Sequence, residues 1–222
     1  MAAQRWLPLE SNPDVMNKYV RNLGAPDDWS FCDVFGMDSD LLAMVPRPVA
    51  AVLFLYPIKE NSEGDPNEKQ DPGTSLYFIK QTIGNACGTI GLIHAFLNNT
   101  DSITLPDGAH LKELLSKSSS LTPEERAKLL EEDECIGSAH EESAKEGQTA
   151  APSIDEKVKL HFVTFIHSDG TLYEMDGRKS APVNHGPTTK DSLLEDTCTV
   201  VKGFMERDPD EVNFTLVALA KQ

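Results

Sequence analysis

The distribution of apolar residues over the first third of the chain predicts a surface helix, a buried strand and a loop. Asn12 and the proline after it begin an amphipathic stretch that stops at Gly24, which indicates a helix over residues 13–22. The segment PRPVAAVLFLYPI, residues 46–58, is apolar and bounded by prolines, which is typical of a buried central strand. Residues 59–75 are polar and rich in turn-forming residues, so we expect a surface loop there.

The middle of the chain has a helical pattern. The apolar run QTIGNACGTIGLIHAF, residues 81–96, predicts a helix of the core, whereas residues 110–117 and 122–133 are amphipathic and predict surface helices. Thr122 and Glu125 have the spacing of a capping box, which indicates that the third of these helices begins there.

Residues 137–157, GSAHEESAKEGQTAAPSIDEK, have a different character. They include no aromatic residue and no leucine, and they show no period that would bury one face. Such a stretch gains too little from burial to offset the entropy lost on ordering, so we predict a mobile segment. Long irregular segments inside a compact domain commonly serve as lids, binding loops or linkers.

The last third of the chain predicts a hairpin, a helix and a final strand. Two β-rich runs within residues 157–177 flank Asp169-Gly170, which is a strong signal for a two-residue hairpin turn. Residues 192–208 have a helical pattern, and the apolar run NFTLVALA, residues 213–220, predicts a strand at the end.

Composition narrows the possible classes of protein. With 222 residues the chain is long enough for one domain with a sizeable core, and no apolar run is long enough to span a membrane. The N-terminal residues do not resemble a signal peptide, so we expect a cytoplasmic protein. A formal charge of −16 argues against nucleic-acid binding and suits a basic partner, although it also serves solubility. The four cysteines have neither the pairing nor the neighbouring histidines of a disulfide or zinc site.

Cys87 is a candidate nucleophile because of its place in the run 81–96. If Asn85 is the N-cap, Cys87 lies in the first helical turn, where free N–H groups and the helix dipole favour a thiolate. Gln81 stands just ahead, where its amide and the backbone N–H of Cys87 could form an oxyanion hole. A free cysteine is more often a small buried apolar residue, so the assignment depends on finding a base.

His161 is the best candidate base among the six histidines. It lies in a predicted buried strand, where an unpaired imidazole is costly and a partner is expected. His94 is seven residues after Cys87, about 10 Å along a helix axis, and is therefore interpreted as a core residue. The remaining histidines in polar or loop sequence are expected to be exposed: His110, His140 and His185.

Asp176 is the predicted partner of His161. A two-residue turn at Asp169-Gly170 places Asp176 opposite Val163 and on the same face as His161, within side-chain reach on the diagonal. A three-residue loop that included Ser168 would move Asp176 to the other face. The hairpin register therefore tests the assignment.

A cysteine at a helix start, a histidine on a strand and an aspartate on the next strand provide a nucleophile, a base and an orienting group. This pattern indicates a thiol hydrolase. Papain-like peptidases, transglutaminases or arylamine acetyltransferases, and deubiquitinases all fit this order, and the spacing alone does not choose among them.

Several segments resemble the small ubiquitin carboxyl-terminal hydrolases. They are QTIGNACGTIGLIHA, LHFVTFIHSDGTLYEMDGRK, PSIDEKV, QRWLPLESNP and MVPRPVAAVL, so the resemblance covers nearly the whole chain. Residues 59–75 look shorter here than in that family. This difference leaves the candidate catalytic residues intact and concerns peripheral substrate contacts.

The resemblance implies a fold and a set of roles. The fold is α/β, with a central antiparallel sheet flanked by helices, a papain-like cysteine hydrolase core and a knotted backbone, in a single domain over 1–222 with 137–157 as a crossover lid. The roles are those of a nucleophile, a general base and acid, an orienting group and an oxyanion donor, carried by Cys87, His161, Asp176 and Gln81. Neither a cofactor nor a metal is expected.

The implied activity is that of a thiol-dependent deubiquitinase. It would release small or unfolded adducts from the C-terminal glycine of ubiquitin through a cysteine thioester, acting as a monomer, with ubiquitin-like modifiers as further candidate substrates. The alternative is a non-catalytic ubiquitin-binding protein. Because the tail of ubiquitin carries two arginines, Glu10, Asp14 and Asp33 are candidate substrate-binding residues, although Asp14 could simply be a favourable charge at a helix N-terminus.

Overall fold

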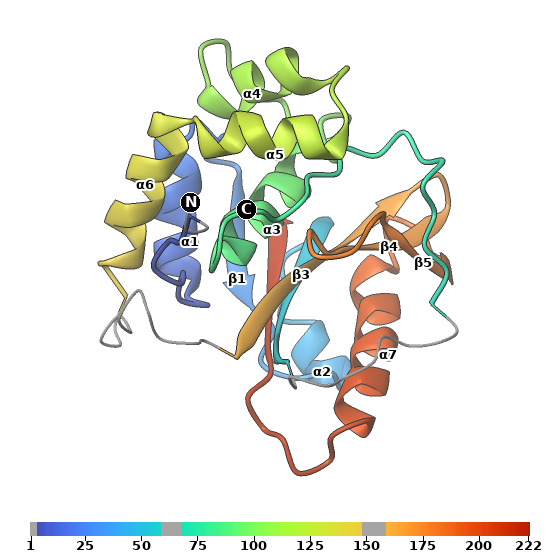
Figure 1. Cartoon of the computed structure of the whole chain (residues 1–222). Helices are drawn as coiled ribbons and strands as arrows, with labels where there is room; N and C mark the ends of the chain where they lie inside the picture. The colour runs from blue at the N-terminus through green and yellow to red at the C-terminus, as the bar shows by residue number, and fades with distance from the viewer. Residues whose placement is uncertain (1–3, 59–67, 148–158) are drawn as a thin grey trace.

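The computed structural model describes residues 4–58, 68–147 and 159–222. Over these ranges the chain forms one six-stranded antiparallel sheet of order β1-β6-β2-β3-β4-β5 with helices on both faces (Figure 1). The strands are β1 (Trp29–Asp33), β2 (Val49–Pro57), β3 (Leu160–Ser168), β4 (Thr171–Met175), β5 (Val183–Pro187) and β6 (Thr215–Lys221). The helices are α1 (Pro13–Asn22), α2 (Ser39–Leu42), α3 (Cys87–Leu97), α4 (His110–Ser118), α5 (Pro123–Glu131), α6 (Glu134–Ala144) and α7 (Leu193–Glu206). The expected α/β architecture with a central antiparallel sheet is confirmed, whereas the knotted path stays a prediction.

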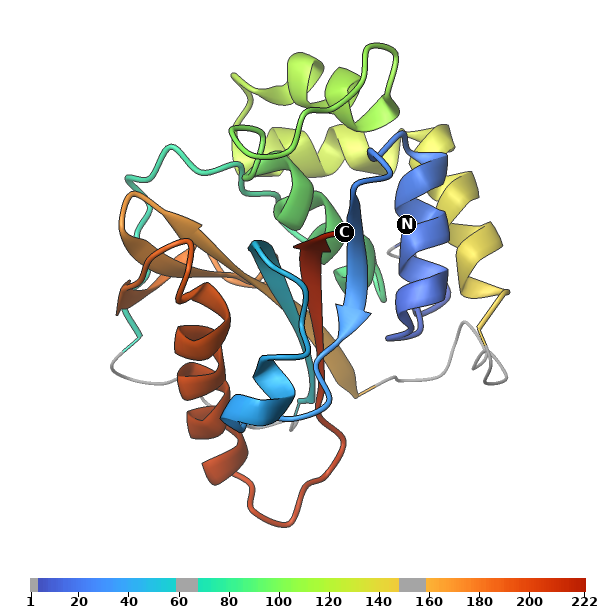
Figure 2. The ribbon, with the colours of Figure 1, turned by 180° about the vertical axis from the view of Figure 1, so that it is seen from behind.

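The sheet separates two apolar cores, because successive residues of a strand point to opposite faces. Leu53 of β2 packs in the core that includes α1, α3, α4, α5 and α6, whereas Phe54 packs in the core formed with α2 and α7. The view from behind shows α7 and α2 together on one side of the sheet (Figure 2). The central strand β2 is buried over most of its length, as the apolar run 46–58 predicts.

Helices α1 and α5 begin at the capping residues that the sequence predicts. The side chain of Asn12 accepts a hydrogen bond from the N–H of Asp14 and caps α1, which spans the predicted residues. Thr122 and Glu125 form the predicted reciprocal capping box at the start of α5. The long apolar run is different, because its helix α3 begins only at Cys87 and the preceding residues form a loop.

The hairpin of β3 and β4 has the two-residue turn that the sequence predicts. Ser168 pairs with Thr171, and the turn residues Asp169 and Gly170 have φ angles of 47° and 77°. Positive φ at both central positions is the requirement of a type I′ turn. The predicted register is therefore confirmed.

The expectation of an irregular segment over 137–157 is wrong for its first part, which belongs to α6. The N-cap of this helix is Asp133, whose carboxylate accepts a hydrogen bond from the N–H of Ile136 at 3.0 Å. It packs beside α1 (Figure 1), and its buried residues are mostly small: Ile136, Ala139, His140, Ser143 and Ala144. Small side chains allow close helix packing without aromatic residues or leucine. Residues 148–157 lie outside the described residues.

His140 corrects a second expectation, because its side chain is buried rather than exposed. Its Nε2 lies 2.6 Å from the carbonyl oxygen of Leu7 and its Nδ1 lies 2.7 Å from Oγ1 of Thr89. Two polar partners satisfy the ring in the core, which the polar sequence around it does not reveal. The expectation is also wrong for His110 and His185, each of which is partly buried and contacts a carboxylate.

His94 is fully buried on α3 and accepts a hydrogen bond from the N–H of Ile79, which confirms its interpretation as a core residue. Residues 68–75 follow the edge of β5, where the N–H of Asn184 donates to the carbonyl of Lys69 at 2.9 Å. The rest of the predicted loop 59–75 lies outside the described residues. Within the described ranges, no helix combines the length and apolar composition needed to cross a membrane.

Candidate active site

Cys87 is the first residue of α3, and the loop before it is held by the N-terminal segment. Asn85 is not the N-cap: it has a φ of 62°, and its side-chain amide donates to the carbonyl of Trp6 at 3.0 Å. The N-cap is Ala86, which makes no side-chain cap hydrogen bond. The predicted position of Cys87 in the first turn is nevertheless confirmed, and the backbone amides of Phe162 and Gly88 help to lower the pKa of its thiol.

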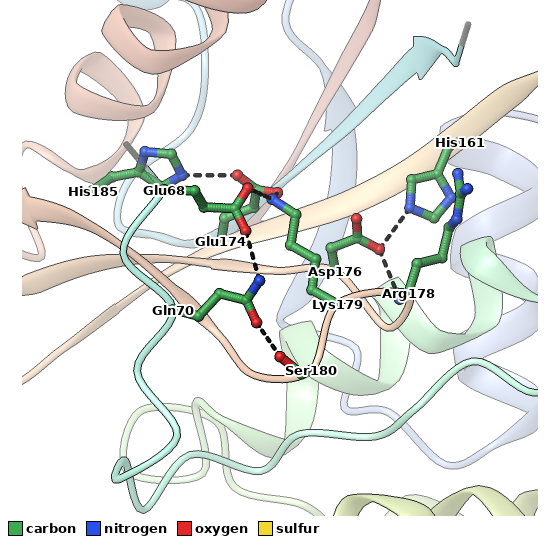
Figure 3. Close-up of polar contacts among 9 residues, drawn as sticks. All are labelled: Glu68, Gln70, His161, Glu174, Asp176, Arg178, Lys179, Ser180 and His185. Atoms are coloured by element: carbon green, nitrogen blue, oxygen red, sulfur yellow. Dashed lines mark hydrogen bonds and ion pairs between the residues drawn. The ribbon is translucent and has the colours of Figure 1, made fainter. Parts of the chain in front are cut away.

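His161 lies on β3 directly opposite Tyr56 of β2, and the two rings meet edge to face with centroids 5.9 Å apart. Asp176 directly follows the last residue of β4. Its Oδ1 lies 2.7 Å from Nε2 of His161, and both side chains are buried (Figure 3). Because Nε2 contacts Asp176, Nδ1 is the ring nitrogen left for the hydrogen bond that joins His161 to Cys87.

The electrostatics of these three side chains favour a charged pair. Burial opposes ionisation of the Cys87 thiol, but the hydrogen bond and the charge of His161 hold its pKa below the ordinary value. Burial also opposes protonation of His161, yet its bonds to Asp176 and Cys87 raise its pKa to about 9. Both directions favour a thiolate beside an imidazolium near neutral pH.

A tight turn after β4 holds Asp176 in place. The N–H of Arg178 donates to Oδ1 of Asp176 at 2.9 Å, and the N–H of Lys179 donates to the Asp176 carbonyl at 2.9 Å. Burial opposes ionisation of Asp176, but the contact with His161 and the N–H of Arg178 hold its pKa below the ordinary value. The carboxylate therefore stays charged beside the imidazole.

Gln81 is tied to the same turn, since its backbone N–H donates to the carbonyl of Gly177 at 2.8 Å. Its side-chain Nε2 donates to the carbonyl of Ile83 at 3.2 Å, and its Oε1 is buried without a hydrogen-bond partner among the described residues. An amide nitrogen carries two N–H groups, so one remains for another acceptor.

The three acidic residues singled out in the sequence lie at or near the start of α1 and the end of β1. Asp14 is exposed in the first turn of α1, and Asp33 is the partly buried last residue of β1. Partial burial and the nearby charge of Asp14 raise the pKa of Asp33. Glu10 is partly buried, with its carboxylate close to Gly147.

Sequence reasoning missed one group of charged side chains beside this site. Next to Asp176, the buried Glu174 contacts Lys179 and His185, which are partly buried, and Lys179 also contacts the partly buried Glu68 (Figure 3). A glutamate inside a predicted buried strand is an available signal, because such a carboxylate requires a cationic partner. Within the described ranges, no group of three or more potential ligands is placed to hold a metal ion.

A cysteine at a helix N-terminus, joined to a histidine and an aspartate on an antiparallel sheet, defines the class of papain-like cysteine hydrolases. The sequence model of "Ubiquitin carboxyl-terminal hydrolase, family 1" matches residues 6–206. The chain belongs to this family and is a cysteine-type deubiquitinating hydrolase.

Individual relatives agree with this assignment. The ubiquitin carboxyl-terminal hydrolase of Aplysia californica is 56% identical over 209 residues, which cover 93% of this chain and 98% of the relative. The isozyme L1 of Rattus norvegicus is 45% identical over 96% of this chain and 97% of its own length. The UCH37 catalytic domain of Trichinella spiralis, solved bound to ubiquitin vinyl methyl ester, has the same fold, with a TM-score of 0.81 at 24% identity over 98% of this chain and 96% of that one.

Proposed function

We propose that the protein hydrolyses small or unfolded adducts from the C-terminal glycine of ubiquitin through a thioester on Cys87. The observation that carries this proposal is that His161 contacts both Cys87 and Asp176 within a member of the ubiquitin hydrolase family. Ubiquitin-like modifiers are further candidate substrates. A non-catalytic ubiquitin-binding protein is disfavoured, because it would have no need of the paired thiol and imidazole.

In the proposed reaction the Cys87 thiolate attacks the carbonyl carbon of the glycine, and the electron pair of the carbonyl moves onto its oxygen. The tetrahedral intermediate then collapses, the bond to the leaving group breaks, and the His161 imidazolium donates its proton to that group. Neutral His161 next takes a proton from water, whose oxygen attacks the thioester and displaces the thiolate. Asp176 keeps the imidazole oriented and stabilises its charged form.

Gln81 is the proposed oxyanion donor. Its place beside the Asp176 turn and the N–H group left on its side-chain amide support this role. The backbone N–H of Cys87, at the uncapped start of α3, is the second proposed donor.

Asp14 and Asp33 are proposed to bind the basic tail of ubiquitin, with Glu10 as a further candidate. A carboxylate whose pKa is raised by burial and by a neighbouring negative charge gains from a cationic partner, and the raised pKa of Asp33 supports such a site. We also propose that the chain acts as one domain. Since α6 takes up the first part of the expected lid, the proposed segment that crosses the active site is residues 145–157.

The proposed chemistry is tested with ubiquitin that carries a C-terminal electrophile. Wild type is expected to form a stable adduct and to turn over a ubiquitin C-terminal ester, whereas Cys87→Ala forms no adduct and shows no turnover. Cys135→Ala is the matched control, because Cys135 is an exposed free thiol on α6. Turnover by Cys87→Ala at the wild-type rate would refute the assignment of the nucleophile.

A further inference from the structure

A cluster of polar side chains around the buried Glu174 lies beside Asp176 (Figure 3). Its members come from β4, the turn after it, β5 and the segment that begins at residue 68. Glu174 of β4 has a side chain only 1% exposed, and Lys179 Nζ donates to its Oε1 at 2.7 Å. Lys179 also donates to Oε2 of Glu68 at 2.6 Å, and Nε2 of His185 lies 2.8 Å from the other oxygen of Glu174. Two carboxylates from different segments therefore share one ammonium group, and the proposed reaction uses none of these side chains.

Lys179 closes the turn that begins with Asp176. Its N–H donates to the carbonyl of Asp176, and its own carbonyl accepts a hydrogen bond from Nζ of Lys80. Between them, the carbonyl of Gly177 accepts the N–H of Gln81. The turn 176–179 thus carries the orienting carboxylate at its first residue and contacts the loop before α3 through Gly177. The side chain of Lys179 anchors this turn at its last residue.

The charges in this cluster suit an anchor. Burial opposes ionisation of Glu174, but His185 and Lys179 hold its pKa below the ordinary value. Burial also opposes protonation of Lys179, yet Glu174 and Glu68 raise its pKa. The ion pair therefore persists at neutral pH, and the charge of Lys179 also helps to keep the pKa of Asp176 low.

Stability alone does not account for such a pair, because buried ion pairs are often no more stabilising than apolar residues of the same size. They do impose a specific geometry when every charge is satisfied. Here the fixed geometry is that of the turn between Asp176 and Lys179. Glu68, from the segment that follows the edge of β5, links that loop to the same turn.

We propose that Lys179, held between Glu174 and Glu68, is a positioning residue that fixes the Asp176 carboxylate against His161. This inference rests on the proposed function, in which Asp176 orients the imidazole. It also gives residues 68–75 a role in the site: they complete the anchor through Glu68, although no contact with substrate is proposed for them.

The test compares kcat and KM for a ubiquitin C-terminal ester among Lys179 variants. Lys179→Met is expected to lower kcat about tenfold, as loss of a supporting partner of a catalytic group typically does, with little change in KM. Lys179→Arg keeps the charge and should restore most of kcat. Lys112→Met is the matched control. This exposed lysine of α4 pairs with Asp107, which precedes that helix, so its loss should leave kcat unchanged.

A double-mutant cycle with Asp176→Asn separates positioning from general destabilisation. If Lys179 acts through Asp176, Lys179→Met lowers kcat much less in the Asp176→Asn background than in wild type. Equal losses in both backgrounds would overturn the proposal, as would a wild-type kcat for folded Lys179→Met.

If Lys179→Met does not fold, Glu68→Gln tests the positioning role instead, because this substitution leaves the Glu174–Lys179 pair intact. A smaller loss of kcat supports the proposal and an unchanged kcat overturns it. Failure of the proposed function is a separate result, since it would appear as a wild type that does not turn over the ester.

Discussion

At the scale of single residues, the pairing of Cys87 with His161 has a consequence for the pH dependence of the thiol. The pKa of Cys87 lies below the ordinary value and that of His161 is raised to about 9. The charged pair therefore exists between these two titrations. Below that window the thiolate gains a proton, and above it the imidazolium loses one.

We expect the thiol of Cys87 to react with iodoacetamide at a pH well below the ordinary thiol pKa, because the thiolate is the reactive form. In His161→Ala, burial remains while the stabilising charge is gone, so the midpoint of alkylation should move to higher pH. The rate of alkylation measured against pH, in a Cys135→Ser background, checks this expectation. The background removes the competing thiol of Cys135, which is exposed and whose pKa is raised by slight burial and by acidic neighbours. The same midpoint with and without His161 would contradict the charged pair.

The contact between His161 and Asp176 could be predicted from the sequence, because it follows from counting residues along the two strands from the hairpin turn. A two-residue turn with positive φ fixes the register, and the register fixes the shared face. The start of α3 could not be predicted to the residue. Asn85 is a favourable N-cap by type, but here its side chain binds the carbonyl of Trp6, a contact about 80 positions away that no local pattern contains.

At the scale of elements, α6 is joined to α3 by a buried chain of hydrogen bonds. The carbonyl of Leu7 can only accept, so Nε2 of His140 carries the proton and Nδ1 accepts from the hydroxyl of Thr89. The oxygen of Thr89 then accepts from the hydroxyl of Tyr19, 2.9 Å away on α1. Three helices and the N-terminal segment therefore meet in one polar cluster. Its central residue, Thr89, is two positions after Cys87 in the sequence.

We expect His140→Ala to lower the free energy of unfolding by about 3 kcal/mol, because it leaves buried polar groups of Thr89 and Leu7 without partners and opens a cavity. Chemical denaturation at pH 7.5 measures the change. His167→Ala is the control: this histidine lies near the hairpin turn and is only partly buried, so a small effect is expected. Equal effects of the two substitutions would contradict the importance of the cluster.

The same variant has a predicted pH signature. Burial lowers the pKa of His140 from 6.5 to about 4, so between these values the unfolded chain binds more protons than the folded one. Stability from the neutral ring is therefore present above the unfolded pKa and lost as the pH falls toward about 4. Over that interval, His140→Ala should lose less stability than wild type.

The elements that could not be predicted from the sequence lack a clear pattern of apolar residues. β1, α2 and β5 have only four or five residues each, too few for a period to stand out. α6 is long enough, but its buried face consists mainly of small residues and a histidine, which on composition alone resembles a solvated segment. By contrast, β2 and the β3–β4 hairpin are predictable because burial on both faces or a tight turn marks the sequence directly.

At the scale of the whole molecule, the proposed crossing of the active site by the chain before β3 would limit the size of the group that leaves. The structure fixes Gly147 after α6 and Lys159 before β3, and 12 peptide links separate them. At about 3.4 Å each, they reach roughly 40 Å. An arch of that contour length over a solid base cannot admit an object wider than about 15 Å, whatever the separation of its ends. A folded domain of ubiquitin's size is roughly 30 Å across.

If the leaving group passes beneath this segment, as proposed, short peptides and small amines are released and folded conjugates react poorly. Inserting about fifteen Gly/Ser residues after Gly147 would widen the limit to roughly 33 Å. We expect this variant to cleave di-ubiquitin at a measurable rate while it keeps the wild-type kcat for a small ubiquitin ester. The matched control is the same insertion between Asp210 and Glu211, in the loop before β6. Di-ubiquitin resistance in the first variant, with normal ester turnover, would place selectivity in the binding surface, because the wider arch would then have removed no barrier.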